Sequence, residues 1–231
     1  MKAVILAAGI GSRLGKTIPK CLTPVLGDTT ILGIQVEILR ACGIDEIVVV
    51  VGFKKELVME QQPDLLYLYN PMYHISNTAR SLELALSAIQ ADDLIWLNGD
   101  VVFESGVVDA VVQSGGNAVA VDKKSCGEEE VKYSLTPTGF VAEISKQVTP
   151  ATGEAVGVNK ITQASFSGFL DCLKIAGDHD YFEKAMETAI NRGIEFRPVD
   201  ISDFNCVEID DGADLAQARK LIENDHGDDD D

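Results

Sequence analysis

The chain has 231 residues, an apolar content of 46% and a formal net charge of -18. This length and apolar content suffice for one sizeable hydrophobic core, so we expect a single domain over residues 1–224. The excess of acidic side chains repels polyanions, and we therefore exclude nucleic acid and anionic membranes as partners. Residues 225–231 are acidic and lack apolar side chains, which predicts a disordered, solvated tail.

The cysteine pattern indicates the redox environment. Five cysteines are scattered along the chain and form no Cys-x-x-Cys pair. An odd, dispersed set argues against a disulfide framework and against a structural zinc site, and favours a reducing cytosol. The apolar run at the N-terminus is too short for a membrane span and no cleavage-site pattern follows it. These observations predict a cytoplasmic protein.

Apolar runs that end in glycine predict buried parallel strands at residues 3–7 and 46–51. Between them, apolar side chains repeat with helical spacing over residues 31–39, and Gly43 is placed to end that helix. The first 52 residues therefore form a strand, a loop, a helix and a second strand.

The same alternation continues along the chain. We expect strands at residues 65–69 and 94–97, with a helix between them that starts at Ser76 or Asn77. This order predicts an α/β fold, a Rossmann-like three-layer sandwich with a mixed, mostly parallel central sheet.

From residue 117 onward, short strand-like pieces replace this regular alternation. They are followed by predicted helices at residues 182–192 and 214–224. We therefore divide the domain into a nucleotide-binding part at residues 1–115 and an acceptor-binding part with a closing helix at residues 116–224.

A glycine-rich loop, AAGIGSRLGK, directly follows the first strand. Its glycines let backbone amides approach an anion closely, and polyphosphate is the natural guest. A dinucleotide fingerprint would need glycine in place of Leu14, and a P-loop would need an earlier glycine at a fixed spacing before Gly15, where this loop has none. Arg13 and Lys20 add two cations, which suits stabilisation of a charged phosphoryl transition state.

Three carboxylates suggest a metal site. Asp100 closely follows the predicted strand at residues 94–97, so its side chain is expected at the same crevice as the glycine loop. Glu208 and Asp210 alternate with apolar residues, which places both acids on one face of a strand. Such hard oxygen ligands suit Mg²⁺.

The segment AAGIGSRLGKTIPKCL resembles the signature of the nucleotidyltransferases that activate sugar phosphates and small alcohol phosphates. The resemblance implies the fold of the nucleotide-diphospho-sugar transferases, with Arg13 and Lys20 as catalytic residues. It implies Mg²⁺ ligation by Asp100 and Asp210, with Glu208 as a third ligand. The nucleotide-binding residues that it implies are Ala8, Gly9, Gly11, Ser12, Arg13, Lys20, Asn77 and Thr78.

Later segments resemble those of choline-phosphate, aminoethylphosphonate and inositol-phosphate cytidylyltransferases. On this basis we assign acceptor binding to Ser81, Lys146 and Lys160, and we add Glu183 because its carboxylate would suit a cationic acceptor. Ordinary solvated lysines are an equal alternative for Lys146 and Lys160, and a helix-surface acid is the preferred interpretation of Glu183.

The resemblance implies a Mg²⁺-dependent enzyme that transfers CMP from CTP to a small phosphorylated or phosphonate acceptor and releases pyrophosphate. The short connection between Arg13 and Pro19 favours a cytidylyltransferase over sugar-phosphate enzymes with a longer insertion. A sugar-1-phosphate nucleotidyltransferase that uses UTP, GTP or dTTP is one alternative. A catalytically silent nucleotide sensor is another alternative. For the oligomeric state, we consider a homodimer.

Overall fold

The computed structural model describes residues 1–11, 17–124 and 126–225. Within these residues, nine strands form a central sheet in which β10-β9-β11-β6-β1-β4-β5 is one continuous path and β8 pairs with β11 and β12. The strands are β1 (Lys2–Ala7), β4 (Ile47–Val51), β5 (Leu66–Tyr69), β6 (Leu94–Asn98), β8 (Asn117–Asp122), β9 (Lys132–Leu135), β10 (Val141–Ser145), β11 (Gly153–Ile161) and β12 (Phe196–Asp200).

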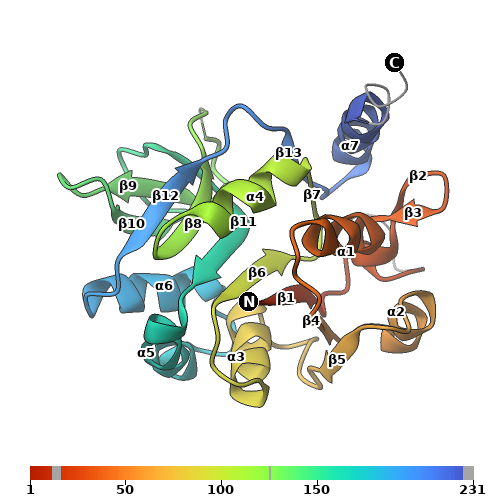
Figure 1. Cartoon of the computed structure of the whole chain (residues 1–231), viewed down its shortest axis with the longest axis horizontal. Helices are drawn as coiled ribbons and strands as arrows, with labels where there is room; N and C mark the ends of the chain where they lie inside the picture. Colours follow the sequence, from red (N-terminus) through yellow and green to blue (C-terminus); the bar gives the residue numbers. More distant parts are fainter. Residues whose placement is uncertain (12–16, 125, 226–231) are drawn as a thin grey trace.

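The sheet is mixed, as predicted (Figure 1). Strands β6, β1, β4 and β5 run parallel, whereas β11 runs antiparallel to both β6 and β8. The same sheet therefore passes through the nucleotide-binding part and the acceptor-binding part that the sequence suggested.

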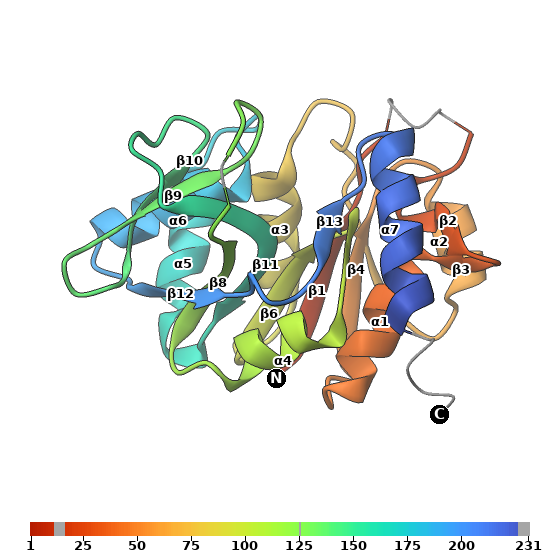
Figure 2. The same cartoon turned by 90° about the horizontal axis from the view of Figure 1, so that it is seen from above.

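Helices cover both faces of the sheet and complete the predicted three-layer α/β sandwich (Figures 1 and 2). One face packs against α1 (Ile31–Ala41), α2 (Lys55–Gln61) and α4 (Ser105–Gln113). The other face packs against α3 (Thr78–Ala88), α5 (Gln163–Ile175) and α6 (Phe182–Asn191). Both faces of β1 are consequently buried, which explains its continuous apolar run.

The remaining elements are short strands, a short 3-10 helix and the C-terminal helix. They are η1 (Lys20–Leu22), β2 (Pro24–Leu26), β3 (Thr29–Thr30), β7 (Val101–Phe103), β13 (Cys206–Glu208) and α7 (Gly212–Asp225). Helix α7 lies beside α1 and the β2–β3 hairpin in Figure 2, and its Leu221 and Ile222 belong to a buried cluster with Val25 and Ile31. Asp211 caps this helix by accepting the backbone N–H of Ala213 at 2.7 Å.

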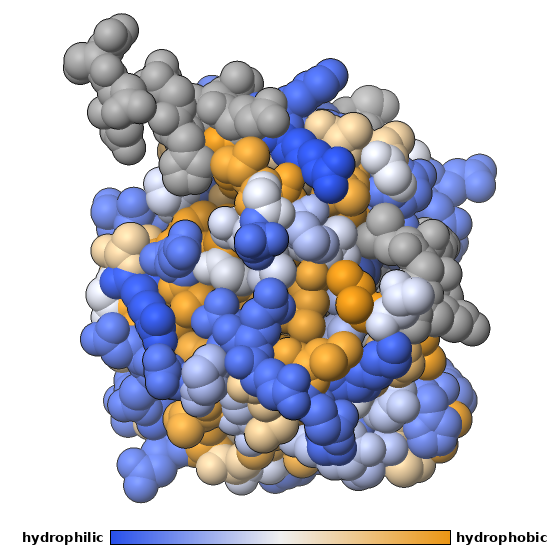
Figure 3. Space-filling model, turned by 90° about the vertical axis from the view of Figure 1, so that its right-hand side faces the viewer, coloured by the Kyte–Doolittle hydropathy of each residue, from blue (hydrophilic) through white to orange (hydrophobic). Residues whose placement is uncertain are grey.

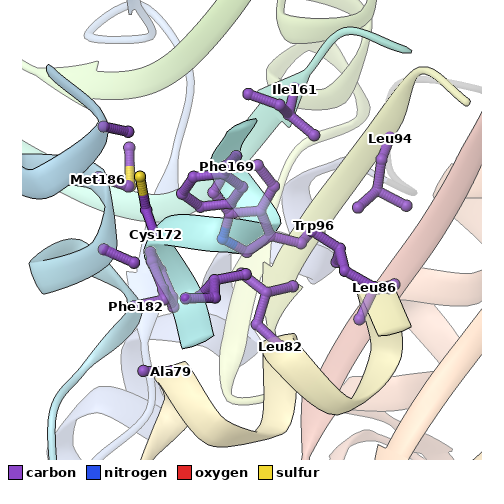
Figure 4. Close-up of a cluster of buried hydrophobic side chains, with 14 of the residues drawn as sticks. Ala79, Leu82, Leu86, Leu94, Trp96, Ile161, Phe169, Cys172, Phe182 and Met186 are labelled. Carbon is purple, nitrogen blue, oxygen red and sulfur yellow. The ribbon is translucent and has the colours of Figure 1, made fainter. Parts of the chain in front are cut away.

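A cluster of aromatic side chains fixes the position of α6 (Figure 4). Trp96 stacks on Phe169 with ring centroids 5.2 Å apart and meets Phe182 edge-on at 5.8 Å. Phe182 is the first residue of α6 and is 1% exposed. Aromatic burial of this kind anchors the beginning of the helix, and with it the direction of the side chains that follow.

All five cysteines are free thiols, as the sequence pattern predicted. On the side of the molecule seen in Figure 3, hydrophobic side chains lie among hydrophilic ones. In the described ranges, no helix has both the length and the apolar character needed to cross a bilayer. The predicted tail at residues 225–231 lies outside these ranges except for Asp225, which ends α7.

Candidate active site

A cleft of about 840 Å³ lies at the carboxyl ends of β1 and β6. This is the usual location for ligands in open α/β sheets. Residues from β1, β6, β11 and β13 line it together with the segments that follow β1 and β6. Its volume falls within the range of about 300–1,000 Å³ that is typical of small-molecule sites.

Close backbone packing shapes the floor of the cleft. Gly99 donates its N–H to the carbonyl of Leu6 at 2.9 Å, and an added Cβ would lie 2.7 Å from that oxygen. Gly11 has a φ of +62°, and its own added Cβ would lie 2.7 Å from Cβ of Lys20. Glycine is therefore required for the first loop to lie directly against Lys20.

Three carboxylates meet in the cleft. Asp100, Glu208 and Asp210 each offer an oxygen within 4.8 Å of the other two. Strand β13 pairs with β7 so that Glu208 lies opposite Val101 in the ladder. The N–H of Ile209 then donates to the carbonyl of Asp100 at 2.9 Å. The two acids late in the chain are thereby placed beside the acid that follows β6.

The alternation predicted around Glu208 is present. Val207 and Ile209 are buried, whereas Glu208 and Asp210 face the cleft. Carboxylate oxygens are the ligands that Mg²⁺ prefers, so the chemistry of these donors fits that ion.

Lys20 lies among these acids. Its Nζ donates to Oδ2 of Asp100 and to Oδ1 of Asp210, both at 2.7 Å. Burial disfavours the charged ammonium, but the two carboxylates outweigh burial and raise the pKa of Lys20 above its usual value. Lys20 is therefore a permanent cation at the junction of the glycine loop and the acidic cluster.

The electrostatic environment of Glu208 disfavours its ionised form. Partial desolvation within the cleft raises the pKa of Glu208 to about 7, and repulsion from Asp100 and Asp210 adds to the shift. A cation bound between the three acids would favour its ionised form.

The first turn of α3 forms another wall of the cleft. Asn77 accepts the N–H of Thr78 at 2.9 Å, and Oγ1 of Thr78 accepts the N–H of Phe182 at 3.0 Å. Both residues line the cleft. These contacts join the start of α3 to the start of α6, so the two helix N-termini border the same cavity.

Two of the predicted acceptor-binding residues do not reach the cleft. Ser81 is 5% exposed, and its hydroxyl accepts a hydrogen bond from Asn70 at 3.0 Å. Lys160 is 4% exposed, and its Nζ donates to the carbonyls of Val111 and Val112 at the end of α4. Both residues therefore have structural roles, which corrects the expectation from the sequence.

Ala8 likewise does not line the cleft. Its carbonyl accepts the N–H of Phe53 at 3.2 Å, and its side chain belongs to the core. Gly9 and Gly11 on the same loop do line the cleft. The predicted residues Ser12 and Arg13 lie outside the described residues.

Lys146 and Glu183, the other two residues assigned to acceptor binding, both line the cleft. Lys146 places its Nζ 3.2 Å from Glu129 and 5.7 Å from the ring centroid of Tyr181. Glu183 is 8% exposed, so the preferred interpretation of this residue as a helix-surface acid was wrong.

Comparison with known proteins identifies the family. Residues 3–167 match the MobA-like NTP transferase domain. The chain belongs to this family.

Relatives of this MobA-like transferase include nucleotidyltransferases with small acceptors. The CMP-5'-(3-aminopropyl)phosphonate synthase of Streptomyces rubellomurinus is 29% identical over 98% of this chain, which spans only 41% of that relative's length. The choline-phosphate cytidylyltransferase of Streptococcus pneumoniae is 35% identical over 42% of this chain and 47% of its own length. The inositol-1-phosphate CTP transferase of T. maritima has the same fold, with a TM-score of 0.80 at 20% identity, over 96% of this chain and 94% of that structure.

The sequence interpretation missed several residues that the MobA-like fold brings to the cleft. They are Asn98, Lys124, Glu129, Glu130, Glu154 and Tyr181. The run of three glutamates at residues 128–130 was a usable signal for an acidic wall, although a charge run is more often a solvated surface.

Proposed function

We propose that this chain transfers CMP from CTP to a small acceptor that carries a phosphate or a phosphonate, with Mg²⁺ held by Asp100, Asp210 and Glu208. An acceptor oxygen attacks the α-phosphorus of CTP. The bond from that phosphorus to the oxygen bridging to the β-phosphorus breaks, and pyrophosphate leaves. The reaction needs no protein nucleophile.

The observation that carries this proposal is the convergence of three carboxylates beside Lys20 and the glycine loop. The acids lie within 4.8 Å of one another, and Lys20 contacts two of them at 2.7 Å. A polyphosphate that enters the cleft would find backbone amides on one side and cations on the other. Within this arrangement, attack at the α-phosphorus is favoured by position and charge rather than by covalent catalysis.

Each part of the chain has a distinct task in this proposal. Gly9 and Gly11 leave space for the triphosphate, and Lys20 neutralises charge that develops on the phosphate oxygens. Bound Mg²⁺ would supply Lewis-acid polarisation of the phosphoryl group. Arg13 would add a second cation near the departing pyrophosphate.

CTP is the favoured nucleotide because two of the relatives described above are named for CMP or cytidylyl transfer. The short connection between Arg13 and Pro19 supports the same choice. A sugar-1-phosphate nucleotidyltransferase is the second candidate, since the resemblance of the glycine loop extends to sugar-phosphate enzymes.

Pyrophosphate release tests the proposal. CTP, UTP, GTP, ATP and dTTP are each incubated with Mg²⁺ and with aminoalkylphosphonates, phosphocholine, inositol-1-phosphate or sugar-1-phosphates, and EDTA provides the metal-free control. We expect release with CTP and a non-sugar acceptor. Release only with another triphosphate and a sugar phosphate would support the second candidate, and nucleotide binding without release from any pair would support a sensor.

A further inference from the structure

Glu183 is a buried acid in the wall of the cleft. It is the second residue of α6, directly after the anchored Phe182, and it is one of the residues that line the cleft. A smaller cavity of about 160 Å³ adjoins the cleft at this position. Four residues line both cavities, namely Val131, Lys146, Tyr181 and Glu183.

The carboxylate of Glu183 lacks a full set of partners. It is 8% exposed, and among the described residues its Oε2 receives no hydrogen bond. Burial raises the pKa of Glu183 to about 7, although its own backbone N–H and the charge of Lys146 oppose the shift. Among the described residues, no ion pair joins Lys146 to Glu183; Nζ of Lys146 lies 3.2 Å from Glu129 instead.

The fold itself gives no reason to bury this acid. A glutamate in the first turn of a helix interacts favourably with the helix dipole, but an exposed one gains the same benefit. A buried acceptor oxygen without a donor costs free energy, so its position is unfavourable for stability alone. A ligand in the cleft that donates a hydrogen bond to Oε2 would remove this cost.

The surroundings of Glu183 favour a cation. The same wall of the cleft carries Glu129, Glu130 and Glu154, and Oε2 of Glu130 also lacks a partner within the described part of the chain. Of the lysines nearby, Lys124 lies 2.9 Å from Glu154 and Lys146 pairs with Glu129. Lys184, which lines the smaller cavity, pairs with Glu187 at 2.8 Å. Acidic groups therefore outnumber basic groups at this end of the cleft, which is opposite in character to what a second phosphate would need.

The unpartnered oxygen also limits the kind of cation. A primary ammonium carries three N–H donors and a full charge, so it satisfies both the oxygen and the negative field. A quaternary ammonium carries no N–H and would leave Oε2 without a donor. A sugar hydroxyl donates one hydrogen bond but leaves the carboxylate charge uncompensated.

We propose that Glu183 binds a primary ammonium group of the acceptor, which makes the acceptor an aminoalkyl phosphate or aminoalkyl phosphonate. The phosphate or phosphonate end then points toward Asp100 and Asp210, and the ammonium end lies between Glu183 and Tyr181. This inference rests on the proposed function, because it assigns the far end of the acceptor in the same cleft.

Matched acceptor pairs test this assignment. Pyrophosphate release from CTP is measured with 2-aminoethylphosphonate against ethylphosphonate and with 3-aminopropylphosphonate against propylphosphonate, and phosphocholine serves as the quaternary probe. For whichever amine is the better acceptor, we expect kcat/KM to exceed that of its deaminated partner by about tenfold or more. This is the effect expected for the loss of a charge-assisted hydrogen bond. Equal use of both members of each pair, or better use of phosphocholine, would overturn the inference while leaving cytidylyl transfer in place.

Variants of the carboxylate locate the effect. In Glu183→Gln the preference for the amine should vanish because KM rises for the amine and stays unchanged for the deaminated acceptor. Glu183→Asp keeps the charge and should retain part of the preference. Glu37→Gln, an exposed change on α1, should match the wild type. A preference that survives in Glu183→Gln would contradict the assignment.

A binding measurement separates this inference from the proposed function. Calorimetry with the aminophosphonates and their deaminated partners reports acceptor affinity without turnover. Tighter binding of the amine that depends on Glu183, without pyrophosphate release from any triphosphate, would retain the ammonium site and reject the transferase. Turnover that does not depend on the amine would retain the transferase and reject the ammonium site.

Discussion

Replacement of Glu183 by glutamine should stabilise the protein, and more strongly at high pH. The side chain is 8% exposed, and burial raises its pKa to about 7 from an ordinary value of 4.5. A difference of this size corresponds to about 3 kcal/mol between the two protonation states. Because the folded state holds the proton more tightly than the unfolded state, the wild type loses stability as pH rises from about 4.5 to about 7.

Glutamine is neutral at every pH in this range, so it avoids that loss. We expect the free energy of unfolding of Glu183→Gln, relative to the wild type, to increase by roughly 2.5 kcal/mol between pH 5 and pH 8. Urea denaturation followed by circular dichroism at both pH values provides the measurement. Glu37→Gln, which changes an exposed acid on α1, gives the background. A stability difference for Glu183→Gln that is the same at both pH values would refute the reasoning.

Three further substitutions test other parts of the structure. Asp100→Asn should lower turnover by about three powers of ten with an unchanged melting temperature, and the exposed Asp64→Asn should leave both unchanged. Lys160→Met should lower the free energy of unfolding by about 1–3 kcal/mol, measured by urea denaturation, because buried carbonyls lose their donor. A raised KM for the acceptor in a folded variant would instead indicate that Lys160 contributes to acceptor binding. Gly99→Ala should lower the free energy of unfolding by about 1–3 kcal/mol, since the new methyl lies 2.7 Å from a carbonyl oxygen. Gly115→Ala should have a smaller effect, because its methyl meets no atom within 4 Å. Equal stability of the two alanine variants would contradict the packing argument.

Local sequence patterns were sufficient for β1, α1, β4, β5, α3 and β6 in the first half of the fold, whereas α2, α4 and the short strands β2, β3 and β7 were not predicted. The apolar runs before Gly9 and Gly52 became β1 and β4, and the helical spacing before Gly43 became α1. These signals are strong because each element is buried on both faces or along one stripe, which leaves a periodic trace in the sequence.

The acceptor-binding part was predicted less completely. Its short strand-like pieces became β8, β9 and β10, but β11, β12 and the helix α5 were not predicted. Strand β11 forms hydrogen bonds with β6, β8 and β9, and this long-range pairing, rather than a local pattern, defines it.

The sequence by itself determined which chemical groups the cleft contains. The glycine loop, the lysine that follows it and the acids that follow two predicted strands all carry their chemistry in residue type and spacing. The acidic cluster could be anticipated because the carboxyl ends of parallel strands meet at one edge of a sheet.

Only the tertiary structure decided which of these groups meet and how each is used. The ion pairs of Lys20 join residues 80 and 190 positions apart, and no local pattern specifies such a contact. Lys160 and Glu183 look like ordinary charged residues in the sequence, yet the packing of α4 and α6 buries both of them. Burial sets the partners and the pKa of a charged group, and burial is a property of the assembled layers rather than of the chain around the residue.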